Sequence, residues 1–129
     1  MTPTEVRKLI SLAEHGKTRD ITIYAKACDK LEDTLTKISV LEADKRQHSL
    51  ASGSNFNAIA LWQRWAEGEA SKLEAQHLEA SSDKEAARQI AVKSLAKVQA
   101  LEILLKKALK EDVLIKRRRA EQNGQPPDA

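Results

Sequence analysis

The sequence predicts an all-α protein: a long antiparallel two-helix coiled-coil hairpin whose second helix is longer than the first. Charged residues make up 32% of the chain and aromatic residues only 3%, and Ala, Glu, Lys, Leu and Arg dominate, as is typical of coiled coils. The prolines stand only near the two ends, at Pro3, Pro126 and Pro127, so none interrupts the long stretch between them. Apolar residues recur at spacings of three and four, which keeps one side of a helix against a partner.

The first helix is predicted over residues 4–50. The opening Thr-Pro-Thr-Glu suits a helix start, because a hydroxyl can cap it, proline suits the first turn and a carboxylate complements the helix dipole. The polar stretch 16–20 leaves open a kink, or a short break with Thr18 capping a new start. The residues predicted to face the partner helix, called the seam, are Val6, Ile10, Ala13, Lys17, Asp20, Tyr24, Ala27, Leu31, Thr34, Ile38, Leu41, Lys45 and His48.

The chain is expected to reverse at residues 51–55, where small polar residues surround Gly53. The second helix is predicted over 56–122, and we expect a disordered tail over 123–129. Capping-box spacing just after Ser81 leaves a break there open, although a continuous helix is preferred. The predicted seam is Ile59, Trp62, Ala66, Glu69, Leu73, Gln76, Ala80, Asp83, Ala87, Ile90, Ser94, Val98, Leu101, Leu105, Ala108, Asp112 and Ile115.

Charge and register together single out the end of the second helix. Folding back at Gly53 pairs positions whose numbers add to about 106, so that Leu31 faces the neighbourhood of Leu73, and Val6 that of 98–101. Residues beyond about Leu104 then have no partner within the chain. The basic and acidic residues of 1–103 cancel, whereas 104–119 carry a net charge of +5. An apolar and basic helix end without a partner is expected to bind a second protein.

Catalytic chemistry finds little support in the sequence. His15, His48 and His77 are scattered without metal-ligand spacing, Cys28 is the only cysteine, and no glycine-rich phosphate loop exists. We therefore expect no enzymatic activity, no metal, no cofactor and no small-molecule substrate. The lone cysteine, the lack of a long apolar run and the lack of a signal-like start favour a cytoplasmic location.

Two features admit more than one interpretation. Trp62 is expected to pack against Leu41 and Lys45 with Trp65 at the seam's margin, and the cluster is either packing near the turn or a protein-binding spot. The basic run 106–119 is either a solvated face, a surface for nucleic acid or membrane, or a docking site for an acidic protein. The neutral remainder of the chain and the lack of interleaved aromatic residues disfavour nucleic acid, so protein docking is preferred.

Several segments together carry a family resemblance. They are LISLAE at 9–14, LE at 31–32, LEA at 41–43 before the small-residue turn, ALEILLKK at 100–107 and RRRAEQ at 117–122. In this layout, which covers nearly the whole chain, the sequence resembles the FliJ-like proteins of bacterial flagellar export and their relatives in virulence type III secretion. The resemblance does not distinguish the flagellar from the virulence system.

The resemblance implies a non-enzymatic stalk or escort protein, cytoplasmic and peripherally associated with the membrane export apparatus. Its implied partners are the export ATPase hexamer, the export-gate membrane protein and export chaperones. The implied ATPase-binding residues are Arg7, Lys8, Leu101, Leu105, Lys106, Lys110 and Arg117. The implied gate-binding residues are Leu41, Lys45, His48, Phe56, Ile59 and Trp62. The alternative is a basic helical nucleic-acid-associated protein or a general coiled-coil adaptor, and the sequence leaves open whether the hairpin is a monomer or a four-helix dimer.

Overall fold

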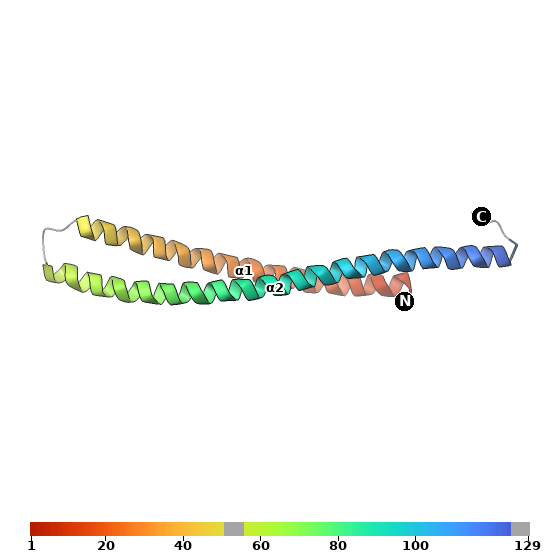
Figure 1. Cartoon of the computed structure of the whole chain (residues 1–129), viewed down its shortest axis with the longest axis horizontal. Helices are drawn as coiled ribbons and strands as arrows, with labels where there is room; N and C mark the ends of the chain where they lie inside the picture. Colours follow the sequence, from red (N-terminus) through yellow and green to blue (C-terminus); the bar gives the residue numbers. More distant parts are fainter. Residues whose placement is uncertain (51–55, 125–129) are drawn as a thin grey trace. The chain divides into compact units, whose positions relative to one another are not determined.

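The computed structural model describes residues 1–50 and 56–124, with the side chains of 1–48 and 57–124. It contains two helices, α1 (Pro3–Leu50, 48 residues) and α2 (Phe56–Gln122, 67 residues), and no strand in the described part (Figure 1). The predicted all-α hairpin with a longer second helix is therefore confirmed, and the observed helix bounds lie within one residue of the predicted ones. The predicted turn at 51–55 and the last residues of the predicted tail, 125–129, lie outside the described residues.

Reciprocal hydrogen bonds fix the start of α1. The backbone N–H of Glu5 donates to the Thr2 hydroxyl at 3.3 Å, and the backbone N–H of Thr2 donates to the Glu5 carboxylate at 3.4 Å. The N–H of Val6 donates to the Thr2 carbonyl at 3.1 Å. This capping box satisfies backbone donors that a helix start leaves without partners, and Pro3 needs none. The predicted cap is thus observed, with Thr2 as its hydroxyl residue.

Both helices are continuous where the sequence had left a break open. Helix α1 passes through 16–20 and α2 through Ser81 without interruption. Local propensity is a weak prior that packing against a partner overrides, and Asp20, within the polar stretch of α1, is one of the buried residues. Helix α2 ends where Gly124 adopts a φ of 71°, a left-handed conformation that glycine takes without strain.

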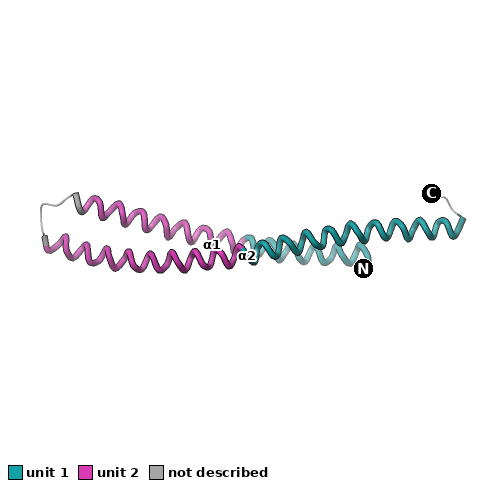
Figure 2. Tube along the Cα trace, in the orientation of Figure 1, with its two compact units in different colours: residues 1–21, 89–129 teal, residues 22–88 magenta. Residues whose placement is uncertain are grey.

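The chain divides into two compact units, each made of one segment from each helix (Figure 2). Unit 1 comprises residues 1–21 and 89–129, and unit 2 comprises 22–88. Within each unit the α1 segment lies beside the α2 segment and runs in the opposite direction. Each unit is therefore a pair of antiparallel helices with its own seam.

The predicted seam of α1 is confirmed almost completely. Twelve of its thirteen residues are buried or half-buried, and only His48 is exposed. The buried residues include Val6, Ala13 and Leu41 and the polar Asp20 and Thr34. The hydroxyl of Thr34 donates to the Lys30 carbonyl of its own helix at 2.9 Å. That bond satisfies a polar side chain that burial would otherwise destabilise.

The seam of α2 differs from the prediction in its middle part. Gln76, Asp83 and Ile90 are exposed, and the residue that follows each of them is half-buried instead. Ile115, the last predicted seam residue, is exposed as well, because it lies beyond the part of α2 that α1 covers. Seam residues alternate between spacings of three and four, except at one point where two spacings of four follow each other. In the structure these two spacings fall at 69–73–77, whereas the prediction placed them at 90–94–98. Such a double step, a stutter, moves the seam around the helix and locally relaxes the supercoil. The observed seam is Ile59, Trp62, Ala66, Glu69, Ala70, Leu73, His77, Ala80, Lys84, Ala87, Ala91, Ser94, Val98, Leu101, Leu105, Ala108 and Asp112.

A polar contact sets the register of unit 1. The Ser94 hydroxyl of α2 donates to the Asp20 carboxylate of α1, and both side chains lie in the seam. Val6 stands 14 residues before Asp20, and Ala108 stands 14 residues after Ser94. Because the helices are antiparallel, Val6 and Ala108 therefore lie level with each other, and they are 0% and 7% exposed. The predicted pairing of Val6 with 98–101 is therefore wrong. The α2 segment without a partner from α1 begins after Asp112 and not at Leu104, as Figure 2 shows at the end of α2.

The register of unit 2 is shifted in the same direction. Leu73 lines a groove together with Ile38 and Leu41, several residues beyond the predicted neighbour Leu31. The midpoint of the turn alone does not fix which residues face each other, because the stutter shifts the seam of one helix only.

Small residues dominate what the two units bury. Five of the eight buried apolar residues are alanines, and the others are Val6, Leu41 and Val98. An alanine side chain removes little apolar area from water, so the helices pair with a modest hydrophobic contribution. A far larger number of big apolar side chains lie exposed on the surface.

We expect the Asp20–Ser94 contact to make stability depend on pH in the acid range. The hydrogen bond from Ser94 holds the pKa of the Asp20 carboxyl below its ordinary 3.8, burial acts in the opposite direction, and Arg19, at 3.2 Å, lowers it further. A lowered folded-state pKa contributes stability above the unfolded value, and this contribution is lost as the pH falls through the folded-state pKa. Ser94→Ala should lower the melting temperature at pH 7, and the difference from the wild type should shrink below pH 3.8, as followed by circular dichroism. Equal melting temperatures at pH 7 would contradict this.

Gly68 offers a stabilising substitution within α2. A β-carbon added there meets nothing within 4 Å, and the φ of Gly68 is not positive. Gly68→Ala should therefore raise the free energy of unfolding by about 1 kcal/mol, because alanine loses less backbone entropy in a helix. Urea denaturation measures this, and a destabilised variant would show that the position has contacts that the structure lacks.

Candidate protein-binding surfaces

At the turn-proximal end, the structure brings together three of the residues predicted to bind the gate. Lys45, His48 and Trp62 line one open groove of about 310 Å³. The rings of His48 and Trp62 are stacked in parallel, with centroids 3.9 Å apart and an interplanar angle of 4°. This stack joins α1 to α2, so Trp62 has a structural role. Ile59 is half-buried, and the side chain of Phe56 lies outside the described residues.

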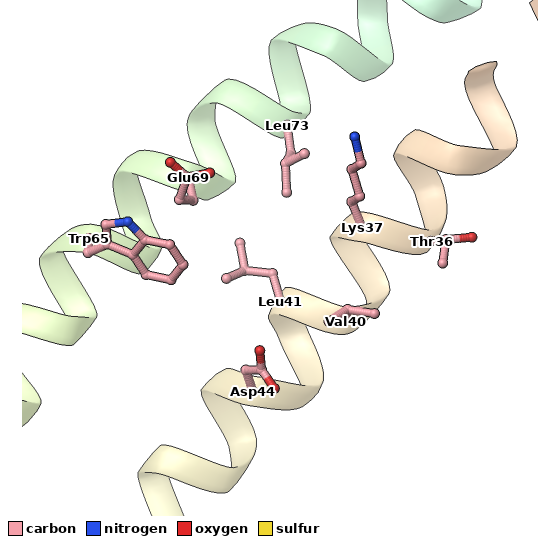
Figure 3. A pocket seen from close by; sticks show the side chains of 8 residues that line it. All are labelled: Thr36, Lys37, Val40, Leu41, Asp44, Trp65, Glu69 and Leu73. Atoms are coloured by element: carbon pink, nitrogen blue, oxygen red, sulfur yellow. The ribbon is translucent and has the colours of Figure 1, made fainter.

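Leu41, the remaining predicted gate residue, belongs to a neighbouring groove in unit 2. The apolar part of this groove consists of Val40, Leu41, Trp65 and Leu73 (Figure 3). Leu41 and Leu73 point into the gap between the helices, whereas Trp65 is 56% exposed. Its polar lining consists of Thr36, Lys37, Asp44 and Glu69, and its volume is about 290 Å³. We call this the Trp65 groove.

The sequence pattern did not indicate that Trp65 is the more accessible of the two tryptophans. Trp62 fits the seam spacing, so it was expected to be the main aromatic contact, with Trp65 at the margin. The structure places Trp62 in a stack and leaves Trp65 accessible in a groove that Val40, also 56% exposed, lines from α1. An accessible tryptophan next to apolar neighbours is a composition that protein interfaces favour. Val40, which lies beside the seam residue Leu41, is the sequence signal that marks this groove.

The seven residues predicted to bind the ATPase fall into two groups. Leu101 and Leu105 are half-buried in the seam of unit 1, where they pack between the helices. Arg7, Lys8, Lys106, Lys110 and Arg117 are exposed. The charged members are therefore available to a partner, whereas the two leucines mainly support the hairpin.

The free end of α2 has a surface of its own. Residues 113–119 follow the last seam residue, and we call them the overhang. Val113, Leu114 and Ile115 are 55%, 47% and 46% exposed. With Leu109 and Lys110, the first two of these line an open groove of about 430 Å³. The overhang therefore combines accessible apolar side chains with a basic cluster.

The basic side chains of the overhang are mostly unneutralised. Lys116 pairs with Asp112 at 3.2 Å, one helical turn away. No ion pair forms between Arg117, Arg118 or Arg119 and any of the described residues. Three adjacent guanidinium groups therefore remain available to carboxylates or phosphates of a partner, for which arginine offers a planar set of donors.

In unit 2, neighbouring side chains shift the pKa values of Tyr24 and Arg88. A hydrogen bond with the Cys28 thiol raises the pKa of Tyr24, and Cys28 itself is half-buried. Two hydrogen bonds to Glu85, at 3.1 and 2.9 Å, raise the pKa of Arg88. Within the described residues no group of three or more His, Cys, Asp or Glu side chains is placed to hold a metal ion.

Comparison with protein-family models, with curated proteins and with solved structures finds no match for this chain. None of the described helices is long and apolar enough to cross a membrane.

The two tryptophans should respond differently to removal. Trp62→Ala deletes the stack on His48 and should lower the free energy of unfolding by about 1 kcal/mol or more, because aromatic pairs add to simple area burial. Trp65→Ala should lower it less, since the side chain is 56% exposed and its only ring contact among the described residues, with Trp62, is tilted by 47° at 6.2 Å. Urea denaturation of both variants provides the comparison. A larger loss for Trp65→Ala would mean that the assignment of the two roles is reversed.

Proposed function

We propose that this protein is a non-enzymatic coiled-coil stalk or escort protein of a bacterial flagellar or related type III export apparatus, which binds the export ATPase ring through the free end of α2. The observation that carries the proposal is the overhang, where apolar and basic side chains project past the paired part of unit 1. The family resemblance of the sequence supplies the identity of the partner. The proposed location is cytoplasmic, at the membrane export apparatus.

The overhang has the properties of an unfilled interface. A single helix exposing Val113, Leu114 and Ile115 gains free energy by burying them, at roughly 25 cal/mol per Å² of apolar area. The adjacent arginines favour a partner that presents acidic groups, and they steer its approach over longer range. A helix end of this kind suits insertion between the subunits or into the central opening of a protein ring.

The corrected register changes which residues are proposed to make this contact. We infer that the ring-facing surface comprises the exposed Lys106, Lys110 and Arg117 together with the overhang, and the neighbouring Arg7 and Lys8 of α1. Leu101 and Leu105 act indirectly by holding the two helices together. The proposed contact thus moves toward the end of α2.

For the second partner, the export-gate membrane protein, we propose the Trp65 groove with the adjacent Lys45 and His48. Both polar and apolar groups line the groove, and its tryptophan is accessible. Trp62 and Ile59 contribute by holding the helices in place. We assign no separate binding surface to export chaperones.

Binding to the purified export ATPase hexamer tests the proposal. Wild-type protein should bind it, and the variant Leu114→Ser/Ile115→Ser should raise the Kd at least roughly tenfold, since truncating buried interface residues commonly costs more than 1 kcal/mol. The matched control is Leu78→Ser, a leucine 65% exposed on the same helix in unit 2, which should bind as the wild type does. Biolayer interferometry measures all three.

Two results would count against the proposal. One is the absence of binding by a wild-type protein whose circular dichroism shows the expected helix content. The other is binding to DNA that weakens steeply with salt and is abolished by neutralising Arg117, Arg118 and Arg119. The second result would favour the nucleic-acid alternative, because displaced counterions make such binding depend on salt.

A further inference from the structure

A second stripe of residues runs along α1 on a side that does not face α2. It consists of Glu5, Leu9, Leu12, Gly16 and Arg19, spaced by four, three, four and three residues. This is the same alternation that defines the seam, so the five residues lie in line along the helix. We call them the outer stripe. All five belong to unit 1.

The outer stripe is accessible in the single chain. Leu12 is 70% exposed, more than any other leucine among the described residues, and Leu9 is 37% exposed. A β-carbon added at Gly16 meets nothing within 4 Å, so open space lies above this position. Leu104 of α2, which the register of unit 1 places within one residue of the level of Leu9, is 38% exposed and continues the apolar surface onto the second helix.

The single chain leaves much more surface in water than a compact monomer does. Its accessible area is 10117 Å², against about 6,800 Å² for a compact monomer of 14.3 kDa. The buried apolar residues are few and mostly alanine. The two exposed leucines at the centre of the outer stripe, with the open space at Gly16 beside them, are therefore candidates for burial in an assembly.

We propose that two copies of this chain pair through the outer stripes of their α1 helices, antiparallel and related by a twofold axis at Leu12. In this arrangement Leu12 packs against Leu12 of the second copy. Leu9 packs over Gly16 of the second copy, where the missing side chain leaves room for it. An isologous contact of this kind requires a surface that complements itself.

The charges at the two ends of the stripe favour a second copy of this chain as the occupant. Glu5 and Arg19 stand seven residues before and after Leu12. In an antiparallel pair centred on Leu12, Glu5 of one copy therefore faces Arg19 of the other, and the reverse pair forms at the opposite end. Both residues are exposed, and within the described residues the ion pair of Arg19 is with Asp20, its neighbour in sequence, at 3.2 Å. Parallel pairing would instead place like charges opposite each other.

The outer stripe is distinct from most of the proposed ATPase contact, and this inference does not rest on the proposed function. Lys8 borders the stripe, three residues after Glu5 and four before Leu12, whereas Arg7 lies on another side of α1 and the overhang is on α2. The same spacing continued into unit 2 reaches Ile23, which is 50% exposed, and then the charged residues Lys26, Lys30 and Asp33, so the apolar part of the stripe ends at Ile23.

Sedimentation equilibrium over a concentration series tests the pairing. The wild type should form a reversible dimer. Leu12→Glu should raise the dimer Kd by roughly 30-fold or more, because two carboxylates would be placed at the centre of the contact. The matched control is Leu78→Glu, which makes the same change at a leucine 65% exposed in unit 2, and it should leave the Kd unchanged. A monomeric wild type, or a Leu12→Glu variant that dimerises like the wild type, would overturn the proposal.

A cross-linking experiment tests the geometry directly. In a Cys28→Ser background, Leu12→Cys places one thiol per chain at the proposed axis, where two thiols come within disulfide distance. Oxidation should give a covalent dimer, whereas Leu78→Cys in the same background should give little. Equal yields from the two variants, with unchanged circular dichroism, would contradict the antiparallel arrangement.

A charge exchange distinguishes this pairing from a general apolar association. Arg19→Glu should weaken the dimer roughly tenfold, since the introduced carboxylate would face Glu5 of the second copy at both ends. Adding Glu5→Arg to that variant should restore most of the lost affinity. Circular dichroism at the measuring temperature must show intact helices, because Glu5 also takes part in the capping box. An absence of restoration in a folded double variant would overturn the assignment of these ion pairs.

Discussion

A carboxylate that leaves water needs a hydrogen-bond donor, and in the seam of unit 1 the Ser94 hydroxyl provides one to Asp20. Sliding the helices by one turn would leave that carboxylate among apolar side chains, which is costly in free energy. The alanines of the seam discriminate little between registers, because one small side chain replaces another without loss. A single polar contact therefore selects the pairing, as polar seam residues do in other coiled coils. The placement of Val6 level with Ala108, and the point where α2 loses its partner, both follow from it.

The small seam residues have a second consequence. They let the helices pair but bury little apolar area, so many large apolar side chains remain on the surface. Those side chains are gathered in different places: the overhang of α2, the Trp65 groove of unit 2 and the outer stripe of α1. The proposed contacts with other chains would bury many of these side chains. In these proposals the paired helices hold the surfaces in place and take no other part.

The three surfaces differ in the chemistry that they offer to a partner. The overhang joins apolar residues to unneutralised arginines, and so favours an acidic partner. The Trp65 groove is apolar between side chains of both charge signs. The outer stripe complements itself in charge and shape, which favours a second copy. Because the stripe and the overhang involve different sides and different helices, the proposed dimer leaves the overhang of each copy free for the proposed ring.

The helix bounds and the seam of α1 could be predicted from the sequence, because both depend on local features: caps, the absence of proline, and the spacing of apolar residues along one helix. The basic cluster could be located in the same way. The register, the stutter near Leu73, the exposed position of Trp65 and the start of the overhang after Asp112 became visible only once the helices were paired. Periodicity describes one helix at a time, whereas register is a property of the pair. The hydrogen bond between Asp20 and Ser94 determines the register more strongly than the midpoint of the turn does. The spacing of residues along the sequence does not show which of the two prevails.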